Sequence, residues 1–299
     1  MDFLKLIRYK NLLMVLLTMF LTKYALIDSQ IPSASLSNFH FVILSSSVVL
    51  ISIGGYLIND VFDINTDLIN KPNRIYIDQT ISVKNAIYVS FFTSFTGFLL
   101  GLYLCIVNDL MYLIWFFLFC ILSLFFYSYD LKKRFFLGNI VISILCSLTI
   151  LLTYLFHAKF LTGAVFFGTS LYKVIIGYAF FAFFTTLIRE IIKDIEDVNG
   201  DLKIKAKTLP IVIGRKRASK VAFLFSCILL FFLFLTLLFF RTNDLFLTYG
   251  MLFMVIPLLF FMRKLWVSKS KKDFSVLSTL LKFIMLSGIL SMILFTIEN

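Results

Sequence analysis

Three aspartates with the spacing i, i+3 and i+7 occur twice in this sequence of 299 residues. The first set is Asp60, Asp63 and Asp67, and the second set is Asp194, Asp197 and Asp201. On a helix these spacings place three mutually repelling carboxylates on one face, which is unfavourable unless cations offset the charge. Carboxylates are the hard oxygen ligands through which Mg2+ commonly bridges a protein to phosphate groups. The repetition predicts one Mg2+–diphosphate site built from both sets, against the alternative that the acids are solvated loop residues.

The segments around these aspartates are apolar enough to lie in a bilayer. Hydrophobic residues make up 61% of the chain and charged residues 15%, against about 45–50% and about 25% in a typical soluble protein. Nine apolar segments each have close to the ~20 residues that cross a hydrocarbon core as a helix. They are approximately Asn11–Ile27, Phe39–Ile58, Ala86–Val107, Leu110–Tyr127, Phe135–Phe156, Val174–Ile192, Val221–Phe240, Leu245–Met262 and Val276–Ile297. We expect an all-α integral membrane protein with nine transmembrane helices in a single bundle, one domain over residues 1–299, and a kink at Pro257.

The basic residues predict the orientation of this bundle. All but four of the 28 lysines and arginines lie on the side that holds the N-terminus, and the exceptions are Lys23, Lys159, Lys173 and Arg241. Cytoplasmic loops are enriched in lysine and arginine. We therefore expect a multi-pass protein of the cell (inner) membrane, with the N-terminus and both aspartate sets cytoplasmic and the C-terminus outside. The same distribution accounts for the net charge of +12 without a nucleic-acid partner, and the sequence indicates no required protein partner.

Further polar segments occur in a fixed order along the chain. The first aspartate set begins at Asn59 and is followed by Lys71-Pro72-Asn73-Arg74, and the second is followed by Thr208-Leu209-Pro210 and Gly214. Between them lies Tyr127-Ser128-Tyr129-Asp130-Leu131-Lys132, and Arg8 and Asn11 open the first helix. These motifs, NDxxDxxxD and YSxxLK among them, resemble those of the UbiA superfamily of intramembrane prenyltransferases over nearly the whole chain. Both aspartate sets would then sit at the start of long cytoplasmic loops, Asn59–Asn85 and Lys193–Lys220.

The resemblance implies a reaction and a set of roles. Two Mg2+ ions, held by all six aspartates, would bind an isoprenyl diphosphate, whose ionisation gives an allylic cation that an acceptor captures. The residues with implied catalytic roles are Asp63, Asp197, Lys132 and Tyr127. The residues with implied substrate-binding roles are Asn59, Arg74 and Lys132 for the diphosphate, and Arg8 and Asn11 for a lipid-soluble or amphipathic acceptor. An arginine suits an acceptor that carries a carboxylate or a phosphate group.

The acceptor is less strongly indicated than the reaction. The segment Leu187–Asp194 resembles a bacterial branch similar to geranylgeranylglycerol-phosphate geranylgeranyltransferases, which implies a glycerol-phosphate ether as acceptor. An aromatic acceptor of quinone or haem biosynthesis is the alternative within the superfamily. Outside it, the alternatives are a secondary transporter with acidic ion sites, a CDP-alcohol phosphotransferase and a non-catalytic scaffold. The aromatic stripe Phe180–Phe184 is a candidate wall for a prenyl chain or, equally, ordinary packing.

The asymmetry of the basic residues leads to a topological prediction. Cysteines introduced at Asn73 and at Asn199 should react with a membrane-impermeant maleimide only after the cells are opened, because both positions follow the aspartate sets on the lysine- and arginine-rich side. Labelling at either position in intact cells would contradict this orientation.

Overall fold

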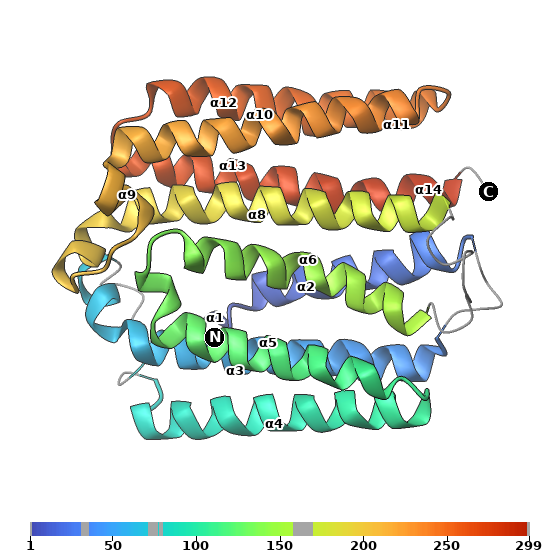
Figure 1. Ribbon diagram of the computed structural model, residues 1–299, viewed down its shortest axis with the longest axis horizontal. Coiled ribbons are helices and arrows are strands. Elements are labelled where there is room, and N and C mark those ends of the chain that lie inside the picture. The colour runs from blue at the N-terminus through green and yellow to red at the C-terminus, as the bar shows by residue number, and fades with distance from the viewer. Residues whose placement is uncertain (1, 31–35, 71–76, 78–79, 158–169, 298–299) are drawn as a thin grey trace.

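A computed structural model of the protein describes residues 2–30, 36–70, 77, 80–157 and 170–297. In these ranges, nine helical spans are long and apolar enough to cross a membrane (Figure 1). Each span overlaps one of the apolar segments expected from the sequence. The prediction of an all-α protein with nine transmembrane helices is therefore confirmed for the part of the chain that is described.

Five of the spans are single helices, and the other four combine helices with short turns. The single helices are α3 (Asn38–Asn70), α4 (Val83–Val107), α6 (Leu137–His157), α8 (Ser170–Lys203) and α10 (Arg215–Phe239). The composite spans are α2 (Tyr9–Leu21) with η1 (Thr22–Ile27); η4 (Met111–Leu113) with α5 (Ile114–Tyr129); α11 (Asp244–Gly250), η7 (Met251–Val255) and α12 (Ile256–Val267); and α13 (Lys271–Leu290), η8 (Ser291–Ile293) and α14 (Leu294–Ile297). Three short elements lie between or before the spans, namely α1 (Asp2–Leu6), η5 (Leu131–Lys133) and α9 (Leu209–Ile213).

Helices α3 and α8 are longer than the sequence suggested. They contain 33 and 34 residues, which at about 1.5 Å per residue is ~50 Å, whereas a hydrocarbon core is ~30 Å thick. The sequence placed the helix ends at Ile58 and Ile192 and the start of loops just beyond them. That expectation was wrong, because both helices continue as polar extensions through the aspartate sets. The two sets therefore lie on rigid helix, at the same end of the bundle (Figure 1).

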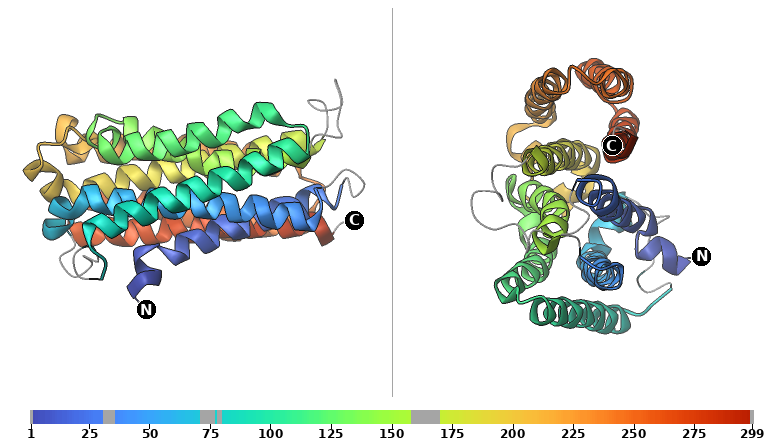
Figure 2. Two further views of the ribbon diagram at one scale, coloured as in Figure 1. Left: turned by 90° about the horizontal axis from the view of Figure 1, so that it is seen from below. Right: turned by 90° about the vertical axis from the view of Figure 1, so that its right-hand side faces the viewer.

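These two helices are also the centre of the packing. Helices α6, α10 and α13 pack on α8, helices α4 and α5 pack on α3, and α3 and α8 contact each other. In the end-on view of Figure 2, α10 and α12 lie at one edge of the bundle and α4 at the other. The aspartate sets are thus carried by two helices that each pack against several others.

Small residues allow α3 and α4 to approach closely, as is usual between helices in membranes. A Cβ atom at Gly54 would lie 2.8 Å from the carbonyl oxygen of Ser90, and one at Gly97 would lie 2.8 Å from that of Ser47. The hydroxyl groups of Ser47 and Ser90 donate hydrogen bonds to the carbonyls of Gly97 and Gly54, at 2.6 and 2.7 Å. Each serine hydroxyl is thereby satisfied inside the bundle.

The irregularity expected at Pro257 takes a specific form. The span is interrupted by η7, a π-helical turn of five residues, directly before α12. Pro257 occupies the first turn of α12, where the missing N–H of a proline costs least. π-helical turns are a known cause of bends within long helices.

A single asparagine joins the ends of α3 and α8. The side chain of Asn70 donates to the carbonyl of Asp197 at 2.9 Å and accepts from the N–H of Gly200 at 3.0 Å. A Cβ atom at Gly200 would lie 2.3 Å from Nδ2 of Asn70. Lys271 of α13 also donates to the carbonyl of Asn70, at 3.0 Å. Position 200 must therefore be glycine for this joint to close.

We predict that Gly200→Ala lowers the free energy of unfolding by about 1–3 kcal/mol, because the added methyl group breaks the hydrogen bonds of Asn70. Gly177→Ala, in the same helix, is the matched control, since the nearest atom to its Cβ would be 3.6 Å away. That control should be neutral or stabilise the protein by up to about 1 kcal/mol. Denaturant or thermal unfolding of the purified protein in detergent measures both, and equal effects would refute the role of this joint.

Candidate active site

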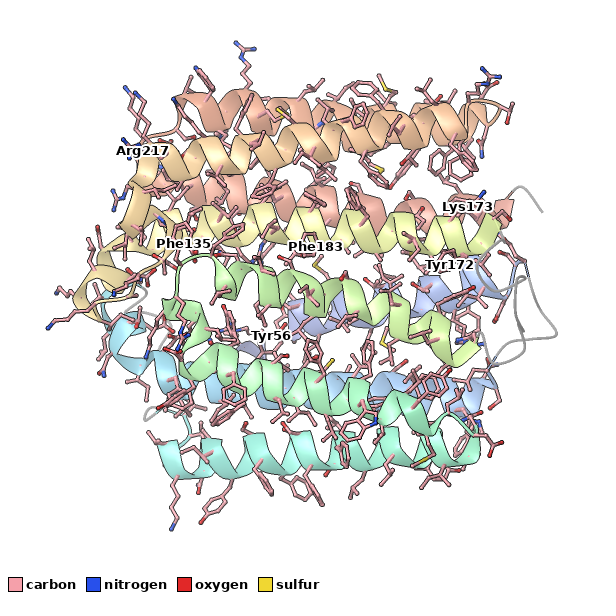
Figure 3. All side chains as sticks on the ribbon, viewed as in Figure 1. Tyr56, Phe135, Tyr172, Lys173, Phe183 and Arg217 are labelled. Atoms are coloured by element: carbon pink, nitrogen blue, oxygen red, sulfur yellow. The ribbon has the colours of Figure 1, made fainter. Side chains whose placement is uncertain are left out.

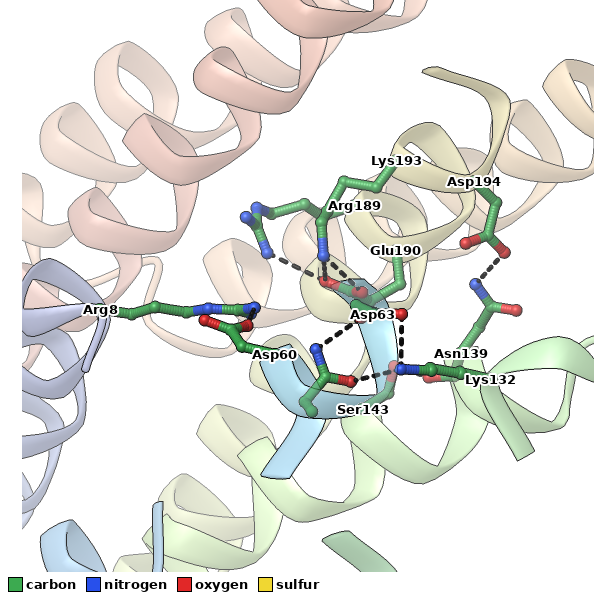
Figure 4. A network of polar contacts seen from close by, with 11 residues as sticks. Arg8, Asp60, Asp63, Lys132, Asn139, Ser143, Arg189, Glu190, Lys193 and Asp194 are labelled. Carbon is green, nitrogen blue, oxygen red and sulfur yellow. Dashed lines mark hydrogen bonds and ion pairs between the residues drawn. The ribbon is translucent and has the colours of Figure 1, made fainter. Parts of the chain in front are cut away.

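Charged side chains meet inside the bundle near the end that carries the aspartate sets. They come from the start of α2, from α3, from η5 and from α8, and Figure 4 shows their network. Its charged members are Arg8, Asp60, Asp63, Lys132, Arg189, Glu190, Lys193 and Asp194. Figure 3 shows all described side chains of the bundle, with Tyr56 of α3 labelled among them.

Asp63 is the centre of a three-residue group. Its Oδ1 forms an ion pair with Nζ of Lys132 at 2.6 Å, and its Oδ2 accepts a hydrogen bond from Asn59 at 2.8 Å. Nζ of Lys132 also donates to Oδ1 of Asn59, at 3.1 Å. Burial lowers the pKa of the Lys132 ammonium below its ordinary value, and the Asp63 carboxylate opposes that shift. The contact with Asp63 thus favours the charged form of Lys132.

The turn η5 holds Lys132 in this position. A Cβ atom at Gly138 would lie 2.8 Å from Cα of Lys132, so the start of α6 can pack against the turn only because residue 138 is glycine. On the other side, the N–H of Lys207 donates to the carbonyl of Lys133 at 2.7 Å. The turn between α5 and α6 is therefore fixed to the segment that follows the second aspartate set.

Asp60 pairs with an arginine whose backbone is strained. Arg8 has φ 53° and ψ 49°, in the left-handed region that residues other than glycine rarely adopt, and it separates α1 from α2. Its guanidinium group forms an ion pair with Asp60 and lies over the ring of Tyr56, 5.1 Å from the centroid. The side chain of Asn11 lies near the Tyr56 hydroxyl. Such backbone strain is often found at functional sites.

The second set has different partners. Oδ2 of Asp194 accepts a hydrogen bond from Asn139, near the start of α6, at 2.7 Å. One turn earlier on α8, Glu190 is buried and accepts from Arg189 at 3.0 Å and from Lys193 at 2.9 Å. Asp60 and Asp63 thus face cations directly, while the basic side chains of Arg189 and Lys193, near Asp194, contact Glu190.

Tyr127 lies near members of both sets. Asp63 of α3 and Asp194 and Glu190 of α8 all act electrostatically on its hydroxyl group. The remaining set members, Asp67, Asp197 and Asp201, are partly buried on the extensions of α3 and α8. Arg74 lies outside the described residues. Among the described residues, no group of three or more acidic, histidine or cysteine side chains converges closely enough to hold one metal ion, so the metal-ligand assignment stays a prediction.

The sequence pattern of the UbiA prenyltransferase family matches residues 12–287. The chain belongs to this family. It is 38% identical over 190 residues to a digeranylgeranylglyceryl phosphate synthase of Methanosphaera stadtmanae, an alignment that covers 62% of this chain and 63% of the synthase. It is 35% identical over 206 residues to that of Methanococcoides burtonii, covering 69% of this chain and 68% of the other.

Solved structures show the same UbiA fold. A structure described as digeranylgeranylglyceryl phosphate synthase in membranes superposes with a TM-score of 0.69 at 24% identity, over 100% of this chain and 98% of the other. A UbiA homologue from Archaeoglobus fulgidus bound to DMAPP and Mg2+ superposes with a TM-score of 0.58 at 17% identity, over 98% of this chain and 99% of the other. The likeness extends over the whole length, so this is a multi-pass membrane protein of the UbiA fold.

Several polar residues of this UbiA site, Tyr56 among them, were not predicted as members. Glu190 lies four residues before Asp194, so helical periodicity could have placed it on the same face. Arg189 and Lys193 were visible as basic residues beside the set, but the sequence does not say that they share Glu190. Asn139 gave no usable signal, because it is a single asparagine at the start of an apolar helix.

The aromatic stripe of α8 packs against its neighbours. Phe180 lies against Phe184 and against Phe232 of α10, with ring centroids 4.4 Å apart in both pairs. Phe181 lines an apolar pocket of about 270 Å³ between α8, α10 and the α11–η7 region. Phe181 and Glu190 are nine residues apart, which on a helix places them on opposite faces. This pocket therefore lies away from the charged network, and the contacts of the stripe favour packing.

A double-mutant cycle can test the Lys132–Asp63 pair without any assumption about function. Lys132→Ala and Asp63→Ala should show a coupling of about 1–3 kcal/mol in the stability of the metal-free protein, because each leaves the other charge buried without its partner. The matched control is the exposed pair Arg134–Asp130, whose coupling should be below about 1 kcal/mol. Additive effects at Lys132 and Asp63, measured by unfolding in detergent, would show that the contact does not form.

Proposed function

We propose that this protein transfers an isoprenyl group from a prenyl diphosphate to a glycerol-phosphate ether, in a Mg2+-dependent reaction at the membrane surface. The observation that supports this most is the placement of two identical aspartate sets on neighbouring helices around a cluster of basic side chains. Membership of the UbiA family and the likeness to digeranylgeranylglyceryl phosphate synthases agree with it. The whole of residues 1–299 would act as one catalytic domain.

The donor atoms of the residues present suit Mg2+, although among the described residues no three of these side chains converge on one point. All six aspartates offer carboxylate oxygens, the ligand type that Mg2+ prefers. Asp60 and Asp63 already face positive charges, in the guanidinium of Arg8 and the ammonium of Lys132. In the proposed site, Asp60, Asp63, Asp67, Asp194, Asp197 and Asp201 hold the metal, which when bound would neutralise charge on the leaving diphosphate.

Lys132, Asn59 and Arg74 would bind the diphosphate. Lys132 and Asn59 already contact each other beside Asp63, so an anion bound to the metal at Asp63 would meet donors that are in place. Fixed cations at a departing anion lower the barrier to its departure, because they need no reorganisation during the reaction. Asp63, Asp197, Lys132 and Tyr127 are the proposed catalytic residues, with the hydroxyl of Tyr127 near members of both sets.

The acceptor follows from the product that the relatives' name describes. A glyceryl phosphate that carries two geranylgeranyl groups is made by transfer of the second group to a geranylgeranylglyceryl phosphate. The bond between C1 and the diphosphate oxygen breaks, the glyceryl hydroxyl oxygen bonds to C1, and the hydroxyl proton leaves with the released diphosphate. Arg8 and Asn11 would hold this acceptor. The end of the bundle with the aspartates would face the cytoplasm.

We predict that purified protein forms the prenylated glyceryl phosphate only with Mg2+ or Mn2+. Asp63→Ala and Asp197→Ala should each reduce the rate to background, because each removes a ligand from one of the two sets. Asp244→Asn, an exposed acid at the start of α11, is the control and should keep full activity. Mass spectrometry identifies the product.

Turnover by either alanine variant in excess EDTA would exclude the two-set site. A product formed only from an aromatic acceptor would replace the proposed substrate by the alternative within the family. Metal-independent uptake of a solute, with no release of diphosphate, would instead support a transporter.

A further inference from the structure

Arg189 carries a buried hydrogen-bond donor that none of the described residues accepts. Its side chain is 15% exposed, and its Nη1 donates to Glu190 at 3.0 Å. Its Nε atom is buried and has no hydrogen-bond partner among the residues that the structure describes. Leaving a charged donor buried and unsatisfied costs stability, so such a group in a polar cluster points to a ligand.

Arg8 approaches the same region from α2. The hydroxyl of Tyr56 and the carboxylate of Glu190 each interact electrostatically with both guanidinium groups, that of Arg8 and that of Arg189. Figure 4 shows Arg8 and Lys132 reaching the α3 carboxylates from opposite sides, with Arg189 above Arg8. Both guanidinium groups thus lie near the same two side chains, Tyr56 and Glu190.

The charges of the whole network are balanced. Its four basic side chains, Arg8, Lys132, Arg189 and Lys193, lie among four acidic ones, Asp60, Asp63, Glu190 and Asp194. The place for one more anion is therefore indicated by the buried, unsatisfied Nε of Arg189 near a second guanidinium group.

We propose that Arg189, together with Arg8, binds the phosphate group of the acceptor, whereas Lys132 holds the diphosphate. This inference rests on the proposed function and adds to it a residue that decides which acceptors are used. Guanidinium groups present parallel donors that match phosphate oxygens, which a lysine ammonium cannot reproduce. Glu190 is a positioning residue, because it holds Nη1 and leaves Nε to the ligand.

A neutral acceptor would leave the donor of Arg189 unsatisfied. The site should therefore favour geranylgeranylglyceryl phosphate over the same ether without its phosphate group. Specificity of this kind arises because a buried polar group without its partner is more costly than a missing apolar contact. The preference should depend on Arg189 and leave the diphosphate substrate unaffected.

The test compares Arg189→Gln, Arg189→Lys and the control Arg217→Gln, an exposed arginine on the first turn of α10. In Arg189→Gln the KM for geranylgeranylglyceryl phosphate should rise about 10-fold or more, as for loss of a charge-assisted contact. The KM for geranylgeranyl diphosphate should stay within twofold of wild type. Arg189→Lys should lie between wild type and Arg189→Gln, and Arg217→Gln should match wild type.

Calorimetric binding of geranylgeranylglyceryl phosphate in EDTA gives a second readout that needs no turnover, and Arg189→Gln should weaken it by the same factor. An unchanged acceptor KM and affinity in Arg189→Gln would overturn the inference while leaving the proposed function intact. Equal losses for both substrates in Arg189→Gln and Arg189→Lys would overturn it too, since the residue would then act on the fold. A wild-type protein that neither binds nor prenylates this acceptor would refute the proposed function itself.

Discussion

A carboxylate held at the edge of a membrane is costly unless a cation or hydrogen-bond donors lie beside it. The charged network obeys this constraint closely. Lys132 and Asn59 satisfy Asp63, Arg8 satisfies Asp60, Asn139 satisfies Asp194, and two basic side chains share Glu190. These contacts come from α2, α3, η5, α6 and α8, so the same requirement that neutralises the acids also ties distant parts of the chain to one point.

The placement of the acids on the two central helices gives this arrangement its rigidity. Helices α3 and α8 are packed on several sides, and the side chain of Asn70 links their ends through the backbone of Asp197 and Gly200. Sites built on regular, well-packed elements hold their geometry better than sites on loops. Two glycines also help to hold the site in place. Gly138 lets the start of α6 pack against the turn that carries Lys132, and Gly200 lets α8 pack against Asn70 at the end of α3.

Much of the fold could be predicted because the bilayer imposes strong rules. Helix length, apolar composition and the side of the basic residues are each visible in the sequence, and the repeated spacing placed Asp60 and Asp194 at one end. The helical extensions beyond Ile58 and Ile192 were missed, since polar residues after an apolar run look like a loop. The partners of the acids were harder. Lys132 entered only through the family resemblance, while Asn139 and Arg189 depend on packing between helices that no local pattern reveals.

The length of α3 decides at what depth the chemistry takes place. At about 1.5 Å per residue, Asp60 lies ~33 Å from the first residue of α3, close to the thickness of the hydrocarbon core, and Asp67 lies ~10 Å further along. Mg2+ gives up its hydration shell reluctantly, so an ion could not easily be delivered to carboxylates sunk among lipid tails. In the proposed site, the extended helix would place them near the headgroup layer, where water is available. An amphipathic substrate could then keep its charged end hydrated and its hydrocarbon end in the bilayer while it is bound.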